Sequence, residues 1–387
     1  MGTGYGAVPG PAAGSLPPTG TGPADTSSRA PLSDHLRKAP HMSTMKSVRT
    51  GGVGTIEVVD VERPAPGPRG VLLRFRACGI CGTDVTFLHM GGMPARAHLG
   101  GELVPVPLGH EPAGEIVEVG AEVTGLKVGD RVVVNPQAAP TGIIGCGGKY
   151  GGMSEFLLIE NAEAGKSVAV FPDTVPFDVA SLNEPMAVAR HAVNRSEAGP
   201  DDQVVVFGAG PIGLGAAIWF KLRGVKHVVV VDVIPSRLEK ALAVGVDAVV
   251  DSATEDVTAR LTALHGRAAN ALGQPRPGTD IYLDAAGAPA VFDTVVANAK
   301  WHAKLVMVAV QKKGEIDLGG MLRSELTLVS SQGYPTEIFE VTPELVEHQE
   351  RFARLISHRV PFAEAERAFG LTMTPGAAEK VVVTLDD

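Results

Sequence analysis

Three short segments of the chain carry side chains that could hold a metal ion together. They are CGICGTD, from Cys78 to Asp84, LGHEP, which contains His110 and Glu111, and LNEP, which contains Glu184. A thiolate, an imidazole and a carboxylate suit zinc, and a catalytic zinc site leaves one position open for water or substrate. One thiolate with one carboxylate would bring about −2 of charge against Zn²⁺. These residues therefore indicate metal-assisted catalysis.

Each of these residues also has a purely structural interpretation. Cys78 is more typical of a small buried strand residue than of a ligand. Glu111 could hold the site without contacting the metal. Glu184 is followed by Pro185, a favourable first helical residue, so its carboxylate could simply stand at a helix start with its direction fixed.

A second motif, VVVFGAGPIGLG, is typical of a dinucleotide-binding turn. Its glycines at 208, 210 and 213 follow a strand and open a helix in G-x-G-x-x-G spacing. The first glycine allows the turn, the second lets the backbone approach the pyrophosphate, and the third lets the helix lie close to the strand. The predicted cofactor turn comprises Gly208, Gly210, Pro211, Ile212 and Gly213.

An acidic residue supports this interpretation of the turn. Asp232 ends the next apolar run, HVVVVD, 24 residues beyond Gly208. A carboxylate there accepts hydrogen bonds from ribose hydroxyls and repels a 2′-phosphate, which favours NAD over NADP. Arg237 either covers the adenine or is an ordinary surface residue. Trp219 and Phe220, on the helix after the turn, are expected in the core or an interface.

The pattern of apolar and polar residues changes near the middle of the chain. From Thr55 to Asp130, short alternating runs predict antiparallel strands of barrel-like character, and no helix is expected there. From Asp202 onward, apolar strands alternate with helical stretches, as in a parallel α/β domain. An amphipathic helix is expected over 342–357, followed by a strand, EKVVVTLD, of the kind found in the first half.

These patterns divide the chain into a tail and two domains. Residues 1–41 form a tail in which 7 glycines and 7 prolines fall within the first 40 positions, so disorder is expected. Residues 42–195 and 335–387 are assigned to a discontinuous catalytic domain, and residues 196–334 to the dinucleotide-binding domain.

Composition excludes several classes of function. The net charge is −9 and there is no basic run, so nucleic acid is not an expected partner. The uncharged run from Val204 to Phe220 contains four glycines and a proline, which indicates a strand, turn and helix rather than a membrane span. Three cysteines cannot build a disulfide framework in 387 residues, and they favour a reducing, cytoplasmic location.

The motifs together resemble a known family. The spacing G-H-E-x-x-G-x-x-x-x-x-G is formed by Gly109, His110, Glu111, Gly114 and Gly120. Combined with CGICGTD and the glycine turn, it resembles the zinc-containing medium-chain alcohol and polyol dehydrogenases, the group of sorbitol, threonine and butanediol dehydrogenases. The likeness runs from about Lys46 to the C-terminus, and LNEPMAVARHAV resembles the segment where polyol dehydrogenases carry an acidic residue at the metal.

The resemblance implies an α/β fold with a Rossmann domain and a discontinuous GroES-like β-barrel domain. It places the sulfur ligand at Cys81 rather than Cys78, beside His110. It makes Glu111 and Glu184 alternating or water-bridged partners of one catalytic zinc ion. A homodimer or homotetramer is expected from the resemblance alone.

Two departures from the family pattern concern the metal and the proton. Many relatives hold a structural zinc with four close cysteines, whereas the corresponding stretch here has Cys146 alone, so no structural zinc is expected. Many relatives carry a proton-relaying histidine where Thr86 stands. Either Thr83 with water and the ribose hydroxyl relays the proton, which we favour, or His89 or His98 does.

The expected activity is transfer of a hydride from a polyol, sugar or secondary alcohol to NAD, giving a ketone or aldehyde. Cys81, Thr83, His110 and Glu184 are the expected catalytic residues. A zinc-free quinone or enoyl reductase of the same superfamily is one alternative, and a non-catalytic NAD-binding protein is another.

Overall fold

The computed structural model describes residues 43–94, 102–310 and 314–385. The predicted disordered tail lies outside these residues. In the described part, no helix is long and apolar enough to cross a membrane. The uncharged run around the glycine turn divides, as expected, into strand β10 (Gln203–Phe207) and helix α4 (Pro211–Leu222).

A seven-stranded sheet forms the half of the molecule that carries Cys81, His110 and Glu111. Its order is β18-β19-β3-β6-β7-β9, with β8 also paired to β3. The strands are β3 (Val71–Gly79), β6 (Glu111–Val119), β7 (Arg131–Val134), β8 (Phe156–Ile159), β9 (Val168–Val170), β18 (Ile356–Pro361) and β19 (Lys380–Thr384). Outside this sheet, β1 (Thr44–Gly52) pairs with β2 (Thr55–Glu62), and β4 (Met93–Pro94) pairs with β5 (Leu103–Val104).

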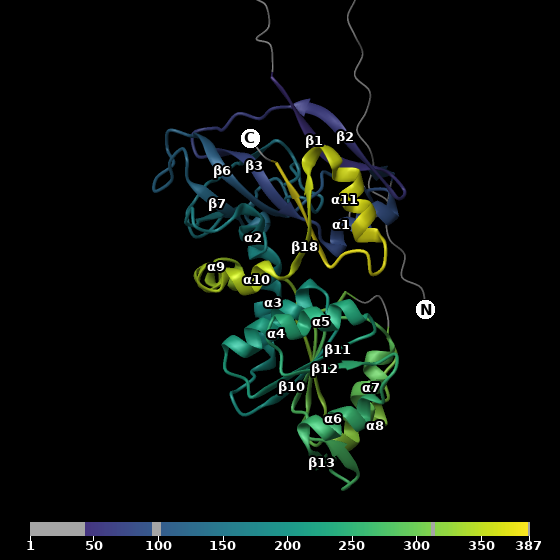
Figure 1. Ribbon diagram of the computed structural model, residues 1–387. Coiled ribbons are helices and arrows are strands. Elements are labelled where there is room, and N and C mark those ends of the chain that lie inside the picture. Colours follow the sequence, from purple (N-terminus) through teal and green to yellow (C-terminus); the bar gives the residue numbers. More distant parts are fainter. Residues whose placement is uncertain (1–42, 95–101, 311–313, 386–387) are drawn as a thin grey trace, which may run out of the picture. The chain divides into compact units, whose positions relative to one another are not determined.

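The C-terminal strand completes this first sheet. β19 runs antiparallel to β3, with Val383 opposite Cys78. Figure 1 shows the yellow C-terminal elements β18 and α11 (Ala365–Met373) beside the purple and blue strands of the first half. From Met42 to the C-terminus the chain is one compact unit, so the domain borders at 195/196 and 334/335 remain predictions.

The prediction that no helix interrupts Thr55–Asp130 was wrong. Helix α1 (Gly82–Met90) follows β3 directly. The Asp84 carboxylate accepts the Cys81 backbone N–H, a capping interaction that fixes the helix start. The nine residues of α1 show no helical periodicity of apolar residues, so the hydropathy pattern does not predict this helix. Only the capping residue Asp84 indicates it.

The second half is a parallel sheet covered on both faces. Its order is β12-β11-β10-β15-β16-β17, which confirms the Rossmann-type domain. Its other strands are β11 (His227–Asp232), β12 (Ala248–Asp251), β15 (Ile281–Asp284), β16 (Lys304–Met307) and β17 (Thr327–Ser330). Alternate residues of β10 enter two different core clusters, so the strand is apolar throughout its length.

Helices pack on both faces of this sheet. One face contributes to a core that includes α3 (Asn183–Ser196), α4 and α9 (Glu337–Glu347), and the other to a core with α6 (Val257–His265) and α7 (Ala290–Asn298). The remaining elements are α2 (Phe177–Ala180), α5 (Pro235–Ala243), α8 (Leu318–Ser324), α10 (Gln349–Ala353), the 3₁₀ turns 136–138 and 362–364, and the hairpin β13 (Arg267–Ala269) with β14 (Pro275–Pro277). Trp219 and Phe220 are fully buried.

The single helix expected over 342–357 is divided. α9 begins earlier, at Glu337, and ends at Glu347; α10 is a separate short helix, and Ser357 already belongs to β18. The buried Glu337 carboxylate accepts hydrogen bonds from His191 Nδ1 and Asn194 Nδ2, both on α3 and both at 2.9 Å. Tertiary contacts with α3 therefore fix a helix start that periodicity alone does not mark.

Replacing Glu337 by glutamine should lower the free energy of unfolding at pH 7 by about 2–3 kcal/mol. Although burial opposes it, hydrogen bonding to His191, Asn194 and the backbone lowers the pKa of Glu337 to about 2. This stabilisation is present above the unfolded-state pKa of about 4.3 and is lost as the pH falls towards 2. Urea unfolding between pH 7 and 3.5 measures it, and the difference between the wild type and Glu337→Gln should shrink on acidification. The exposed Glu364, changed to glutamine, should show no such trend.

Candidate metal centre and cofactor turn

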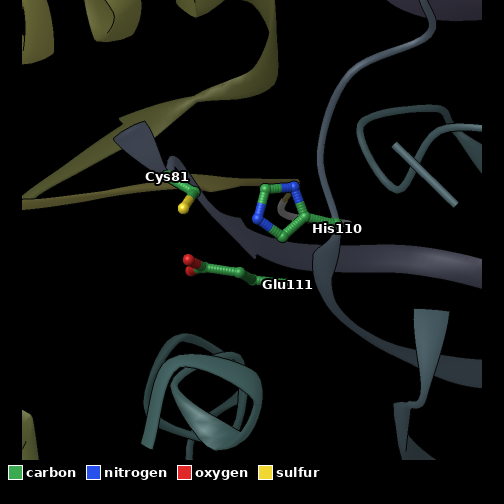
Figure 2. A group of neighbouring side chains, drawn as sticks. All are labelled: Cys81, His110 and Glu111. Atoms are coloured by element: carbon green, nitrogen blue, oxygen red, sulfur yellow. The ribbon is translucent and has the colours of Figure 1, made fainter. Parts of the chain in front are cut away.

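Three predicted ligand side chains converge at the junction of β3, α1 and β6. One donor atom each from Cys81, His110 and Glu111 lies within 4.8 Å of the others. Figure 2 shows the Cys81 sulfur, one ring nitrogen of His110 and the Glu111 carboxylate facing a common point. His110 and Glu111 are buried, and Cys81, just before α1, is half-buried. Glu111, the first residue of β6, and His110 directly before it thus meet a third residue from a helix cap.

The two oxygens of the Glu111 carboxylate have different surroundings. Oε2 pairs with Nζ of Lys380, a buried residue at the start of β19 that also donates to the Ile80 carbonyl at 3.1 Å. Oε1 is buried, and none of the described residues hydrogen-bonds it. A buried acceptor without a donor is costly, so this oxygen is suited to a cation.

Electrostatics also fit a cation at this point. Burial alone would lower the pKa of His110, but the negative charges of Asp84 and Cys81 outweigh it and raise that pKa well above its usual value. The site therefore attracts positive charge at the imidazole. A sulfur, nitrogen and oxygen donor set with this charge fits Zn²⁺.

Asp84 joins the two ligand-bearing segments. One carboxylate oxygen accepts the Cys81 backbone N–H at 2.9 Å, and the other accepts the Gly109 backbone N–H at 3.0 Å. The side chain is fully buried. Sequence reasoning gave Asp84 no role, although its position three residues after Cys81 is the spacing of a helix cap.

Lys380 was likewise given no role by the sequence analysis. The only indication in the sequence is a single lysine at the start of an otherwise apolar strand, KVVVT. Burial would lower the pKa of Lys380, but the charge of Glu111 raises it above its ordinary value. The lysine is therefore a buried cation held by its partner.

Glu184 does not belong to the group formed by the three ligands. It lies in the first turn of α3, which begins at Asn183, so Pro185 is not the first helical residue as expected. The side chain is buried, and burial raises the pKa of Glu184 to about 7, with His110 and Lys380 opposing this and Glu111 adding to it. The Glu184 carboxylate therefore interacts electrostatically with two of the three ligands, His110 and Glu111.

Hydrogen bonds from neighbouring helices hold the start of α3. The Asn183 amide donates to the Ile338 carbonyl at 2.5 Å and accepts from the Thr342 hydroxyl at 2.7 Å. Trp219 Nε1 donates to the Met186 carbonyl at 2.9 Å. The turn that carries Glu184 is therefore fixed against both α9 and the cofactor-side helix α4.

The other candidates near the metal centre differ in position. Thr83 Oγ1 lies 3.7 Å from the Cys81 sulfur, whereas Thr86 is exposed and its hydroxyl donates to the Gly82 carbonyl within the same helix. Cys78 is fully buried on β3, outside the ligand group. His89 is exposed, and His98 lies outside the described residues.

The glycine turn has the geometry that its motif predicts. Gly208 adopts φ +95°, where a β-carbon is strained, and a β-carbon on Gly213 would strike the Gly208 carbonyl oxygen. Gly210 is the N-cap of α4, and a β-carbon there would meet nothing within 4 Å. Two glycines are thus needed for packing, and the third leaves free space at a helix N-terminus.

Asp232 lies at the carboxyl end of β11, facing this turn. Its carboxylate accepts N–H groups from Ala209 at 2.6 Å, Val233 at 2.7 Å and Ile234 at 2.9 Å. Arg237, half-buried on α5, has a buried Nε atom that no described residue hydrogen-bonds. Asp232 is therefore joined to the turn by a hydrogen bond, whereas no hydrogen bond among the described residues joins Arg237 to it.

Comparison with known proteins gives consistent matches along the chain. Residues 67–169 match the model of the alcohol dehydrogenase GroES-like domain, and residues 211–348 match that of the zinc-binding dehydrogenases. The chain is 31% identical over 359 residues to (R,R)-butanediol dehydrogenase of Bacillus subtilis (strain 168), covering 88% of this chain and 99% of that protein. It is 30% identical over 360 residues to sorbitol dehydrogenase of Homo sapiens, covering 87% and 94%.

Solved structures show the same architecture with either cofactor. An alcohol dehydrogenase (rspB) of E. coli CFT073, complexed with NADH, has a TM-score of 0.73 at 26% identity, covering 89% of this chain and all of that chain. A zinc-binding dehydrogenase of Sinorhizobium meliloti 1021, bound to NADP, has a TM-score of 0.74 at 28% identity, covering 88% and 99%. Together with the converging ligands and the glycine turn, these matches show that the chain belongs to the zinc-dependent medium-chain alcohol and polyol dehydrogenase family.

Proposed function

We propose that the protein oxidises a polyol, sugar or secondary alcohol to a ketone or aldehyde, with NAD as the hydride acceptor and one zinc ion at Cys81, His110 and Glu111. The observation that carries this proposal is the convergence of three donor atoms, together with a buried Glu111 oxygen that has no hydrogen-bond partner among the described residues. Glu184 is proposed as a fourth ligand, whose carboxylate alternates with that of Glu111 or is bridged by water.

Four residues around the proposed zinc site have distinct proposed roles or are excluded from one. When bound, zinc would lower the pKa of the substrate hydroxyl as a Lewis acid, and NAD would accept the hydride. Asp84 holds the Cys81 and His110 segments in register through two backbone N–H groups. Lys380 offsets the Glu111 charge. Thr83, 3.7 Å from the Cys81 sulfur, is the proposed first carrier of the hydroxyl proton, whereas the exposed Thr86 is not suited to that role.

The glycine turn and Asp232 are proposed to bind NAD. Free N–H groups and the positive end of α4 would receive the pyrophosphate next to Gly210. Asp232 already accepts three backbone N–H groups, and a carboxylate has about four acceptor sites. The remaining acceptor site suits a ribose hydroxyl, and the negative charge disfavours a 2′-phosphate. Pro211, Ile212 and Arg237 complete the proposed cofactor site.

Replacing Gly210 by alanine should weaken NADH binding by at least about tenfold with little loss of stability. The new β-carbon meets no protein atom within 4 Å, but it would occupy the space where the pyrophosphate must approach. Gly370→Ala, where a β-carbon also meets nothing, is the control and should leave binding unchanged. NADH fluorescence titration measures both; unchanged binding in Gly210→Ala would contradict the proposed cofactor position.

Substrate class and assembly are further parts of the proposal. The acidic residues at the site, together with the likeness to butanediol and sorbitol dehydrogenases, favour substrates with neighbouring hydroxyls. A homodimer or homotetramer is proposed, because β17 ends the parallel sheet and α8 exposes Leu318 and Leu322.

A cytoplasmic location is also proposed. All three cysteines are free thiols, as is usual in a reducing compartment.

The decisive experiment measures NADH formation across sugar alcohols, diols, hydroxy amino acids and secondary alcohols, with NADP in parallel and zinc quantified per chain. Turnover with NAD that a chelator removes supports the proposal and identifies the substrate class. Reduction of quinones or enoyl substrates that resists chelation would favour the zinc-free reductase instead. If protein loaded with zinc and NADH turned over none of these substrates, a non-catalytic role would be favoured.

A further inference from the structure

His110 presents its two ring nitrogens to different neighbours. One faces Cys81 and Glu111, as Figure 2 shows, and the other, Nδ1, lies 3.3 Å from the Cys146 sulfur and 3.7 Å from Oδ1 of Asp84. A neutral imidazole carries one N–H and one lone pair. For Nε2 to offer its lone pair to a metal, the proton must therefore be on Nδ1, where it needs an acceptor.

Asp84 is not the better acceptor of that proton. Its Oδ1 accepts the Gly109 backbone N–H at 3.0 Å, and its Oδ2 accepts that of Cys81 at 2.9 Å. At 3.7 Å, the separation of Oδ1 from Nδ1 exceeds hydrogen-bond distance. The Cys146 sulfur, at 3.3 Å, is within the longer range of a sulfur acceptor.

The loop around Cys146 is tightly held against the His110 segment. Gly145 has φ +69°, and a β-carbon there would strike the Gly109 carbonyl oxygen. The backbone N–H of Gly152 donates to that same oxygen at 2.7 Å, and the N–H of Met153 donates to the Leu108 carbonyl at 3.0 Å. Only a glycine at 145 allows this approach, so the loop delivers the next residue, Cys146, to a fixed place beside the ring.

We propose that Cys146 is a positioning residue whose sulfur accepts the Nδ1 hydrogen of His110, fixing the ring orientation and the tautomer that leaves Nε2 free for a metal ion. The inference deepens the proposed function, because it rests on His110 as a ligand. Hydrogen-bond partners of ligating histidines typically change metal affinity about 10–100-fold when removed. Cys146 thus acts through His110 and not as a ligand.

The test compares zinc affinity in wild type, Cys146→Ala and Cys146→Ser, by competition with a chromophoric chelator, and records the absorption of the cobalt-loaded proteins. Cys146→Ala should lose about 10–100-fold in zinc affinity. Cys146→Ser should recover most of it, since a hydroxyl oxygen also accepts an N–H. Cys78→Ala, which removes another buried thiol that lies outside the ligand group, is the matched control and should change zinc affinity little.

The sulfur-to-cobalt charge-transfer band separates positioning from ligation. It should keep its intensity per bound cobalt in Cys146→Ala, while the visible bands shift as the ring reorients. Unchanged zinc affinity in Cys146→Ala, a serine variant as weak as the alanine variant, or a reduced charge-transfer band would each overturn the inference alone. Wild-type protein that binds neither zinc nor cobalt would overturn the proposed function as well.

Discussion

Changing His110 to alanine is expected to reduce alcohol oxidation by at least about a thousandfold while NADH still binds. A Lewis-acid metal contributes several kcal/mol of charge stabilisation to such a reaction, and each 1.4 kcal/mol is about tenfold in rate. His110 supplies one of three converging donor atoms, and without its imidazole Cys81 and the two proposed carboxylates form a poorer zinc site. Steady-state kinetics, zinc content and NADH titration of the same preparation measure the three parts of this prediction.

The neighbouring exposed histidine provides the control. His89→Ala, on the last turn of α1, should leave zinc content and turnover near wild type. Cys81→Ser should behave like His110→Ala, because it removes another of the converging donor atoms. If either ligand variant lost NADH binding and folding together with zinc, the metal would be structural, contrary to the proposal.

The ligand group could be predicted because its members are carried on short segments. His110 and Glu111 are adjacent in the chain, and Cys81 is the N-cap residue of α1. Local spacing in the chain therefore determines most of the distances between donor atoms. The glycine turn was predictable for the same reason, since β10, the turn and α4 are consecutive.

The residues that support this group could not be predicted in the same way. Lys380 meets Glu111 across 269 positions of the chain, and Cys146 meets His110 across 36. Such contacts depend on the register of β19 against β3 and on the path of a glycine-rich loop, neither of which leaves a periodic signal. A buried lysine in an apolar strand indicates that a partner exists but does not identify it.

Replacing Lys380 by methionine is expected to lower the free energy of unfolding of the metal-free protein by about 3–5 kcal/mol. Both side chains of the Lys380–Glu111 pair are almost fully buried. Loss of the cation leaves an uncompensated, buried carboxylate beside Gly79, a position where any β-carbon would strike Glu111 Oε2. Chemical denaturation of chelator-treated protein measures this loss of stability. The control is Lys46→Met, which removes an exposed ion pair with Asp60 and should cost no more than about 1 kcal/mol.

A second substitution and added zinc distinguish a charge effect from a packing effect. Glu111→Gln in the Lys380→Met background removes the stranded charge, so the double variant should regain most of the lost stability, although it should not regain activity. Zinc should raise the melting temperature of Lys380→Met more than that of the wild type, because a bound cation takes over the role of the missing ammonium group. A double variant as unstable as Lys380→Met would show that packing, not charge, is lost; an equal zinc effect in both proteins would mean that Glu111 does not face the metal.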